Sequence, residues 1–128
     1  MLVSPEGIQL PNGLYIRYPN LKYNTEDYTY GKYEYQSRKG TVSIWGGALV
    51  ENVVQALARI IVGQQMLEVN KRYPVSLTVH DAAVCLVNEE DVDEALAWIV
   101  EVMSKPPIWA KGLPVACEAN YGRTYGDC

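Results

Sequence analysis

Two adjacent side chains in the middle of the chain, His80 and Asp81, are of the types used in acid–base or metal chemistry. His80 is the one histidine among 128 residues, and the pair is flanked by the apolar residues Val79 and Ala82. An acid beside a strand that buries itself must be hydrogen-bonded, ion-paired or bound to a metal. Two interpretations are open: a functional carboxylate at a turn, or a surface turn in which Asp81 caps its own backbone.

The residue types at this turn indicate that side chains are wanted there. A two-residue hairpin turn whose side chains have no further role is usually Asn-Gly or Asp-Gly. Histidine and aspartate enter the left-handed conformation less readily than glycine does. We therefore treat His80 and Asp81 as candidate functional residues, with metal binding as one of the roles open to Asp81.

A different chemistry is that of an unrelated hydrolase, which would use either His80 and Asp81 or Cys85 as a nucleophile. Cys85 lies within a continuous apolar run, residues 82–87. A thiol in such a run is normally buried and inert. Because the chain has no second histidine to activate it, we rank this alternative last.

A third set of polar side chains lies on one side of a predicted helix. Glu51, Asn52, Gln55 and Arg59 are spaced one and four residues apart, which places them on the same side. Such a stripe is usually a solvated surface. Amides followed by an arginine are also the side chains that hydrogen-bond to base edges and sugars, so a nucleic-acid contact is the second interpretation.

The composition is that of an ordinary globular chain of one-domain length. The formal net charge of −4 argues against a free-standing nucleic-acid binder, because such proteins usually carry a basic balance. Three cysteines without a short-spaced pair argue against both a disulfide framework and a zinc knuckle, and favour a reducing compartment. We expect no secretory signal, and no stretch long and apolar enough to span a bilayer.

The first third of the chain is predicted to be rich in β-structure. One hairpin is expected around Asn12-Gly13, and a second around Lys39-Gly40. The tyrosines between them suit the surface of a sheet. Because lysines and arginines are interleaved with them, a surface that stacks on bases and contacts phosphates is the alternative. The tyrosines concerned are Tyr23, Tyr28, Tyr30, Tyr33 and Tyr35.

The rest of the chain alternates helices and strands. Apolar periodicity predicts a helix over about 49–71, after Gly46-Gly47, and a second helix from an N-cap at Asn88 to about Met103. Between them, residues 74–88 read as a strand, a sharp corner and a second strand, and 113–120 as a last strand. We expect a single α+β domain over 1–128, with a β-hairpin region at 1–45 and a core at 46–128, in which both helices cover one face of an antiparallel sheet. The sheet looks incomplete, because the apolar second strand of the 74–88 hairpin implies a neighbouring strand.

Four separated motifs resemble family A DNA polymerases, the DNA polymerase I family. Residues 79–85 are similar to that family's third motif, in which a His-Asp-Glu tip carries one of two metal-binding aspartates. Residues 46–59 resemble the helix before this motif in bacteriophage members. Residues 10–19 resemble the strand pair that follows the fingers, and 112–127 the C-terminal end. The motifs follow in the right order over nearly the whole chain.

The resemblance implies that this chain is the C-terminal portion of a polymerase palm. Asp81 would then bind Mg²⁺, His80 would approach the primer terminus, and Asn52, Gln55 and Arg59 would contact the minor groove of the primer–template duplex. Nucleotide and primer–template DNA would be the substrates, in the cytoplasm of an infected or lysogenic bacterial host. The upstream palm aspartate and the fingers motifs are absent from this sequence. We therefore expect the chain to need an upstream polymerase part and to be inactive alone.

One departure from the family pattern leaves an alternative open. Ala82 stands where the family has glutamate after the metal-binding aspartate, and Glu118 is a candidate to replace that carboxylate. The alternative is a non-catalytic, palm-derived module that binds DNA or a polymerase partner.

Overall fold

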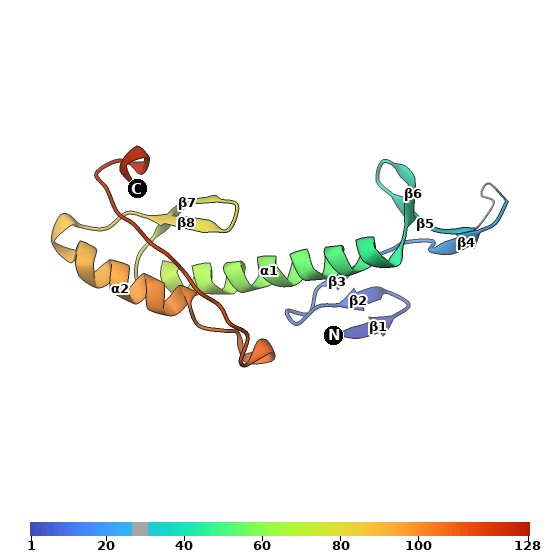
Figure 1. Cartoon of the computed structure of the whole chain (residues 1–128), viewed down its shortest axis with the longest axis horizontal. Coiled ribbons are helices and arrows are strands. Elements are labelled where there is room, and N and C mark those ends of the chain that lie inside the picture. The colour runs from blue at the N-terminus through green and yellow to red at the C-terminus, as the bar shows by residue number, and fades with distance from the viewer. Residues whose placement is uncertain (27–30) are drawn as a thin grey trace. The chain divides into compact units, whose positions relative to one another are not determined.

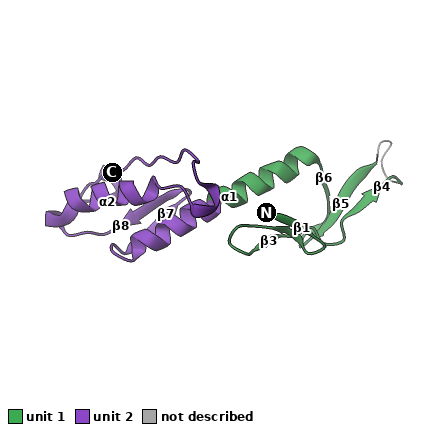
Figure 2. Cartoon of the chain, turned by 90° about the horizontal axis from the view of Figure 1, so that it is seen from below, with its two compact units in different colours: residues 1–58 green, residues 59–128 purple. Residues whose placement is uncertain are grey.

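The computed structural model describes residues 1–26 and 31–128 and divides into two compact units. Unit 1 comprises Met1–Ala58 and unit 2 comprises Arg59–Cys128 (Figure 2). The boundary lies inside helix α1 (Gly46–Asn70), whereas we placed the internal division between residues 45 and 46. Two members of the tyrosine-rich passage, Tyr28 and Tyr30, lie outside the described residues.

The first sheet of unit 1 forms around the predicted Asn-Gly turn. It consists of β1 (Leu2–Ser4), β2 (Gly7–Gln9) and β3 (Tyr15–Ile16), antiparallel in that order (Figure 1). Gly13 adopts a φ of 84°, and the side chain of Asn12 accepts a hydrogen bond from the N–H of Leu14 at 3.1 Å. The hairpin is therefore confirmed. Strand β1 was not predicted.

The second sheet of unit 1 carries the tyrosines. It is built from β4 (Lys22–Asn24), β5 (Lys32–Ser37) and β6 (Gly40–Ile44) in that order, so the hairpin around Lys39-Gly40 is confirmed. Tyr23 and Tyr33 are cross-strand partners with ring centroids 5.0 Å apart. This pairing is what the sheet-surface interpretation requires.

Helix α1 confirms the predicted long helix and corrects one expectation about it. It begins at Gly46, three residues before the predicted start, and ends at Asn70. By length and composition it is long and apolar enough to cross a membrane, so the expectation that no stretch had this property was wrong. These criteria are equally met by a core helix of a larger protein, and Arg59 within it is a costly residue at membrane depth.

Unit 2 contains the predicted hairpin and second helix. Strands β7 (Val75–Val79) and β8 (Ala82–Cys85) are antiparallel and form a two-stranded sheet. Helix α2 spans Val92–Met103. The predicted N-cap is corrected: Asn88 precedes a 3₁₀ turn, Glu89–Asp91, and its side-chain amide donates to the Asp91 carboxylate instead of capping the helix.

The predicted last strand over 113–120 does not form. The segment contains no strand, although from Val115 to Asn120 its residues alternate between half-buried and exposed, as strand residues do. A strand exists only when its backbone groups pair with a neighbouring strand. Within the part of the chain that the structure describes, unit 2 supplies no such partner, since its one sheet is the pair β7 and β8. The α+β class is confirmed, and a palm-type sheet stays a prediction.

A buried glutamine joins the two helices of unit 2. Gln65 on α1 is 8% exposed, and its Nε2 donates to the backbone carbonyls of Met103 at 2.8 Å and Lys105 at 3.2 Å. These carbonyls lie at the C-terminal end of α2, where helical carbonyls lack intrahelical partners. Val69 and Ala95 are buried in the same unit.

We expect Gln65→Met to lower the free energy of unfolding of unit 2 by about 1–3 kcal/mol. Methionine keeps the volume but leaves two carbonyls at the end of α2 without a donor. Urea unfolding followed by circular dichroism measures the change. Lys71→Ala, which removes an exposed ion pair with Glu68, is the control and should cost less than about 0.5 kcal/mol. Equal effects of the two substitutions would contradict the capping role.

Candidate functional site

The candidate site is the tip of the β7–β8 hairpin. Val79 pairs with Ala82, so the loop consists of two residues, His80 and Asp81. His80 has a φ of 54°. In a two-residue hairpin loop this conformation is normally given to glycine or asparagine. A histidine held there costs backbone strain, and such strain is concentrated at functional sites.

The Asp81 side chain is exposed and has no partner in the chain. Among residues 1–26 and 31–128, its carboxylate forms neither a hydrogen bond nor an ion pair. In particular it does not cap its own backbone, which was the structural interpretation of this turn. An exposed carboxylate at a rigid tip is available to a ligand outside the chain.

Arg59 is brought to the same tip from helix α1. Its guanidinium Nη1 lies 3.4 Å from the backbone carbonyl oxygen of His80, to which it donates, and both residues are exposed. Unit 2 therefore gathers three of the predicted site residues, Arg59, His80 and Asp81. The contact with the His80 carbonyl could not be read from the sequence, because the two residues are far apart along the chain.

Asn52 and Gln55 belong to unit 1 and are described within it. Both are exposed. Asn52 Nδ2 donates to the hydroxyl oxygen of Tyr18 at 3.0 Å, and Gln55 Nε2 donates to Glu51 at 3.1 Å. Their predicted exposure is confirmed, and their contact with DNA stays a prediction. Tyr18 was missed, because nothing in the spacing of the sequence links it to the helix.

The tip carries one candidate metal ligand. Asp81 provides a hard oxygen ligand of the kind that Mg²⁺ prefers. No group of three or more His, Cys, Asp or Glu side chains that could hold a metal forms in the ranges 1–26 and 31–128. Glu118, exposed on segment 113–120, is therefore not gathered with Asp81 into such a group. A single carboxylate is by itself a weak site for Mg²⁺, so metal binding at Asp81 stays a prediction.

Cys85 is not placed for catalysis. It pairs with Val75, at the end of the hairpin away from the tip. Three residues of strand separate it from Ala82, which corresponds to about 10 Å. Burial raises the pKa of the Cys85 thiol, which lowers its thiolate fraction at neutral pH. Cys85 therefore lacks the lowered thiol pKa that a catalytic nucleophile needs.

Comparison with known proteins shows which class of protein this chain is similar to. The chain is similar to part of a DNA polymerase. The particular relative is the DNA polymerase of Bacillus phage SP02, which is 37% identical over 123 residues, covering 87% of this chain. The chain spans 18% of the length of that polymerase. No protein-family model and no solved structure matches the chain.

This similarity supports the DNA polymerase resemblance seen in the motifs. It spans most of both units, since it covers 87% of the chain. Family A and the palm portion rest on the motifs themselves. The need for further polymerase parts stays a prediction.

We expect the thiols of Cys85 and Cys117 to react slowly with iodoacetamide at pH 7.5. Burial raises the pKa of both, and for Cys117 the neighbouring Glu118 carboxylate raises it further. Both rates should increase as the pH rises toward and above 9, where thiolate forms. The exposed Cys128 should be labelled first. Mass spectrometry of tryptic peptides measures the labelling, with Cys128→Ser as the control. If Cys85 were labelled fastest, the hypothesis that it is a catalytic nucleophile would be restored.

Proposed function

We propose that this chain is the C-terminal palm portion of a family A DNA polymerase and supplies one metal-binding carboxylate to its active site. The observation that carries the proposal is the exposed, unpartnered Asp81 beside a strained histidine at a hairpin tip. The similarity to a phage DNA polymerase supports the class of enzyme. The reaction is the attack of a primer 3′-hydroxyl on the α-phosphate of a deoxynucleotide.

Asp81 would hold Mg²⁺ as one of several carboxylate ligands. When bound, a pair of magnesium ions stabilises the charge that develops on the attacking and leaving oxygens. The two-residue loop gives Asp81 little freedom to move, because the β7–β8 ladder fixes both of its ends. Preorganised ligands of this kind cost no reorganisation during the reaction.

His80 and Arg59 would act beside the carboxylate. His80 would approach the primer terminus. Arg59, which already contacts the His80 carbonyl, brings a permanent positive charge suited to a phosphate or to an acceptor on a base edge. With Asn52 and Gln55, it would bind the minor groove of the primer–template duplex. These amides are exposed and can exchange their present partners for acceptors on DNA.

The chain alone should not extend a primer. One carboxylate is a weak Mg²⁺ site, and the second palm aspartate and the nucleotide-gripping fingers lie outside this sequence. The required partner is the upstream part of the polymerase, and the place of action is the cytoplasm of the bacterial host. The negative net charge fits this role, since the phosphate-binding surfaces would lie on the missing parts.

A non-catalytic module is the second candidate. It is favoured by Ala82, which follows Asp81 where the family has a glutamate. Such a module would bind DNA or a polymerase partner without metal. It predicts no magnesium-dependent synthesis even when all other polymerase parts are present.

We expect Asp81→Asn to lower primer extension about 10³-fold or more, because asparagine keeps the size and loses the charge that holds the metal. The assay uses a chimera in which this chain replaces the matched segment of the Bacillus phage SP02 polymerase. Asp93→Asn, an exposed exchange of the same kind in the first turn of α2, should change activity less than about threefold.

An inactive parent chimera would favour the non-catalytic module over the polymerase. Retained activity in the Asp81→Asn chimera would exclude Asp81 as a metal ligand. Circular dichroism should be the same for both substituted chimeras, since neither carboxylate is buried.

We expect Arg59→Ala to weaken binding of the same chimera to primer–template DNA. Loss of one phosphate contact should reduce the slope of log K against log salt by about 1. Fluorescence anisotropy at several salt concentrations measures both quantities. Arg123→Ala is the control, because it removes an arginine from an exposed ion pair with Glu89. If Arg59→Ala left the affinity unchanged, the polar side of α1 would be a solvated surface that does not contact DNA.

A further inference from the structure

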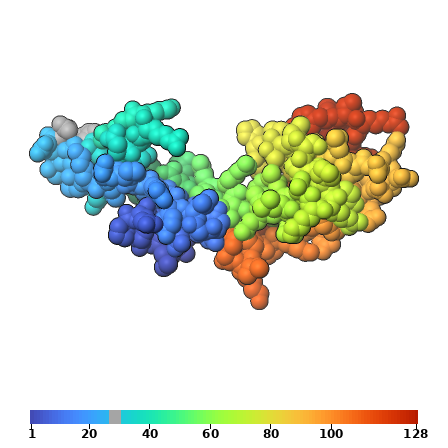
Figure 3. All heavy atoms as spheres, turned by 180° about the vertical axis from the view of Figure 1, so that it is seen from behind, coloured from blue at the N-terminus to red at the C-terminus, as the bar shows by residue number. Residues whose placement is uncertain are grey.

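One face of the second sheet in unit 1 carries tyrosine rings on neighbouring strands. The sheet lies at the surface of the unit, light blue to cyan in Figure 3. Successive residues of a strand point to opposite faces, so Tyr33 and Tyr35 of β5 share one face. Tyr23 on β4 pairs with Tyr33, which places it on the same face. Tyr23 and Tyr33 are 56% and 54% exposed, so their rings form the surface of the sheet and are also accessible to a ligand.

The rings continue from the sheet to helix α1 within the same unit. Tyr18 packs edge-on against Tyr35, with ring centroids 5.0 Å apart and ring planes at 89°. The N–H of Gln36 donates to the carbonyl of Pro19 at 2.8 Å, which fixes the segment that carries Tyr18 to β5. The Tyr18 hydroxyl accepts the hydrogen bond from Asn52 on α1. We call the four tyrosines that follow one another from Asn52 across the sheet the aromatic row: Tyr18, Tyr35, Tyr33 and Tyr23.

No carboxylate of the three strands lies on the face of the aromatic row. Strands β4, β5 and β6 are described in full, and their one acidic residue is Glu34. Glu34 lies on the opposite face, because it follows Tyr33 directly in β5. It is 6% exposed, and its carboxylate accepts a hydrogen bond from Asn24 Nδ2 at 3.0 Å. The strands therefore present no negative charge that would repel a phosphate from the rings.

The passage that contains the aromatic row is basic, although the chain as a whole is acidic. Residues 15–44 contain five lysines or arginines and three aspartates or glutamates, whereas the formal net charge of the chain is −4. Arg38 and Lys39 are exposed in the turn between β5 and β6, and Arg17 is exposed beside Tyr18. Within the ranges 1–26 and 31–128, none of these three cations forms an ion pair. Their charges are available to phosphates of a bound strand.

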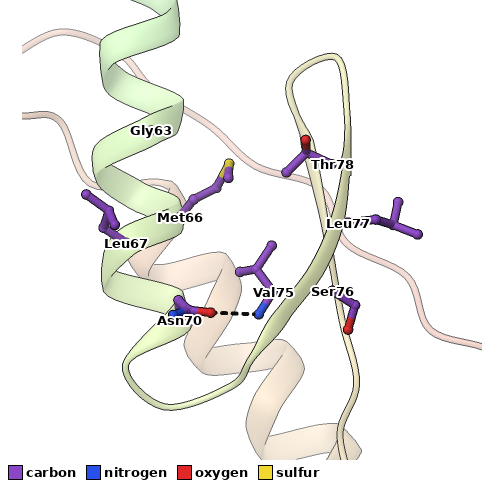
Figure 4. A pocket seen from close by; sticks show the side chains of 8 residues that line it. All are labelled: Gly63, Met66, Leu67, Asn70, Val75, Ser76, Leu77 and Thr78. Carbon is purple, nitrogen blue, oxygen red and sulfur yellow. Dashed lines mark hydrogen bonds between the residues drawn. The ribbon is translucent and has the colours of Figure 1, made fainter.

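The shallow groove of unit 2 between α1 and β7 lacks both of these features. Met66, Leu67 and Thr78 are among its lining residues, and Asn70 accepts a hydrogen bond there from the N–H of Val75 at 3.0 Å (Figure 4). None of the residues that line the groove is aromatic or basic. A nucleic acid would find no ring to stack on and no cation to pair with in this groove, in contrast to the aromatic row.

We propose that the aromatic row binds single-stranded DNA, namely the unpaired part of the template strand, whose bases stack on Tyr23 and Tyr33. Stacking of this kind accepts any sequence, because every base has a π-face. Arg17, Arg38 and Lys39 contact the phosphates. The unpaired template is the occupant because it is the single-stranded part of a primer–template, whereas the base faces of a duplex are covered by neighbouring bases.

This inference rests on the proposed function for the identity of the DNA, since a polymerase acts on a primer–template. It goes beyond that function because strand binding by the aromatic row needs neither Asp81 nor a metal ion. It also differs from the contact proposed for Asn52, which concerns the minor groove of the duplex. The aromatic row gives the chain a second DNA surface, with a different chemistry and a preference for unpaired bases.

Binding of the free chain to two matched DNA molecules tests the preference for an unpaired template. One is a fluorescently labelled primer–template with a 5′ template overhang of about 16 nucleotides, and the other is the same duplex without the overhang. We expect the molecule with the overhang to bind at least about fivefold more tightly at low salt, as measured by fluorescence anisotropy. Equal affinity for the two molecules would overturn the proposal.

A pair of substitutions at Tyr33 tests whether the ring face is what binds. Tyr33→Phe keeps the ring and should change the affinity for the overhang molecule less than about twofold, whereas Tyr33→Leu keeps an apolar side chain without a π-face and should weaken it about tenfold. Tyr121→Leu is the control, because Tyr121 is also 60% exposed but belongs to unit 2. Unchanged affinity for Tyr33→Leu would overturn the proposal. Tyr23→Leu tests the same surface from another strand if circular dichroism shows that Tyr33→Leu does not fold.

Nitration of tyrosines by tetranitromethane tests whether another part of the polymerase covers the aromatic row instead. In the chimera with the SP02 polymerase, Tyr23 and Tyr33 should be nitrated as fast as in the free chain when DNA is absent. Addition of the overhang molecule should slow both at least about fivefold, because stacked bases cover the rings. Slow nitration in the chimera without DNA would overturn the proposal, since a protein surface would then occupy the row.

The two proposals fail in distinguishable ways. If binding of the overhang depends on Tyr33 but the chimera is inactive, strand binding by the aromatic row stands and the polymerase function fails. If the chimera is active, its activity depends on Asp81 and Tyr33→Leu leaves the affinity for the overhang unchanged, the function stands and the aromatic row fails.

Discussion

The antiparallel ladder between β7 and β8 is the constraint on which the candidate site depends. By pairing Val79 with Ala82, it leaves a loop of two residues and forces His80 to a φ of 54°. A loop so short has few conformations, so the Asp81 carboxylate is held out to solvent without a partner in the chain. Arg59 secures the same loop through the His80 carbonyl. The strain at His80 is tolerated because the ladder and this contact determine the conformation.

Large apolar side chains are exposed on each of the two units. Val50 and Val54 are more than half exposed in unit 1, as are Leu67 and Leu86 in unit 2. Among residues 1–26 and 31–128, few side chains are buried, and the largest that is fully enclosed is Val69. A protein that folds to bury apolar surface seldom leaves so much of it in water. Contact with further polymerase parts, as proposed above, would cover these side chains.

Local patterns in the sequence were sufficient to predict most of the helices and hairpins. The sequence predicted the turn at Asn12-Gly13, the turn at Lys39-Gly40 and the long helix. Glycines at turns and the periodic spacing of apolar residues are signals that lie within a few residues of one another. The exposure of Asn52 and Gln55 followed from the helical period. Strands β1 and β4 were missed, since each has three residues and too little pattern to detect. The contact between Arg59 and His80 joins distant residues, which periodicity does not encode.

The sequence by itself determined the α+β class, the hairpin with its carboxylate at the tip and the face of α1 that carries the amides, because each depends on residue type and spacing alone. Tertiary structure decided three other matters: the absence of a strand at 113–120, the two-stranded state of the β7–β8 sheet and the position of Arg59 at the tip. A strand requires a neighbour as well as an alternating sequence, and the described chain contains no neighbour for that segment. Pairing between distant segments is a property of the assembled backbone, and no single stretch of sequence specifies it.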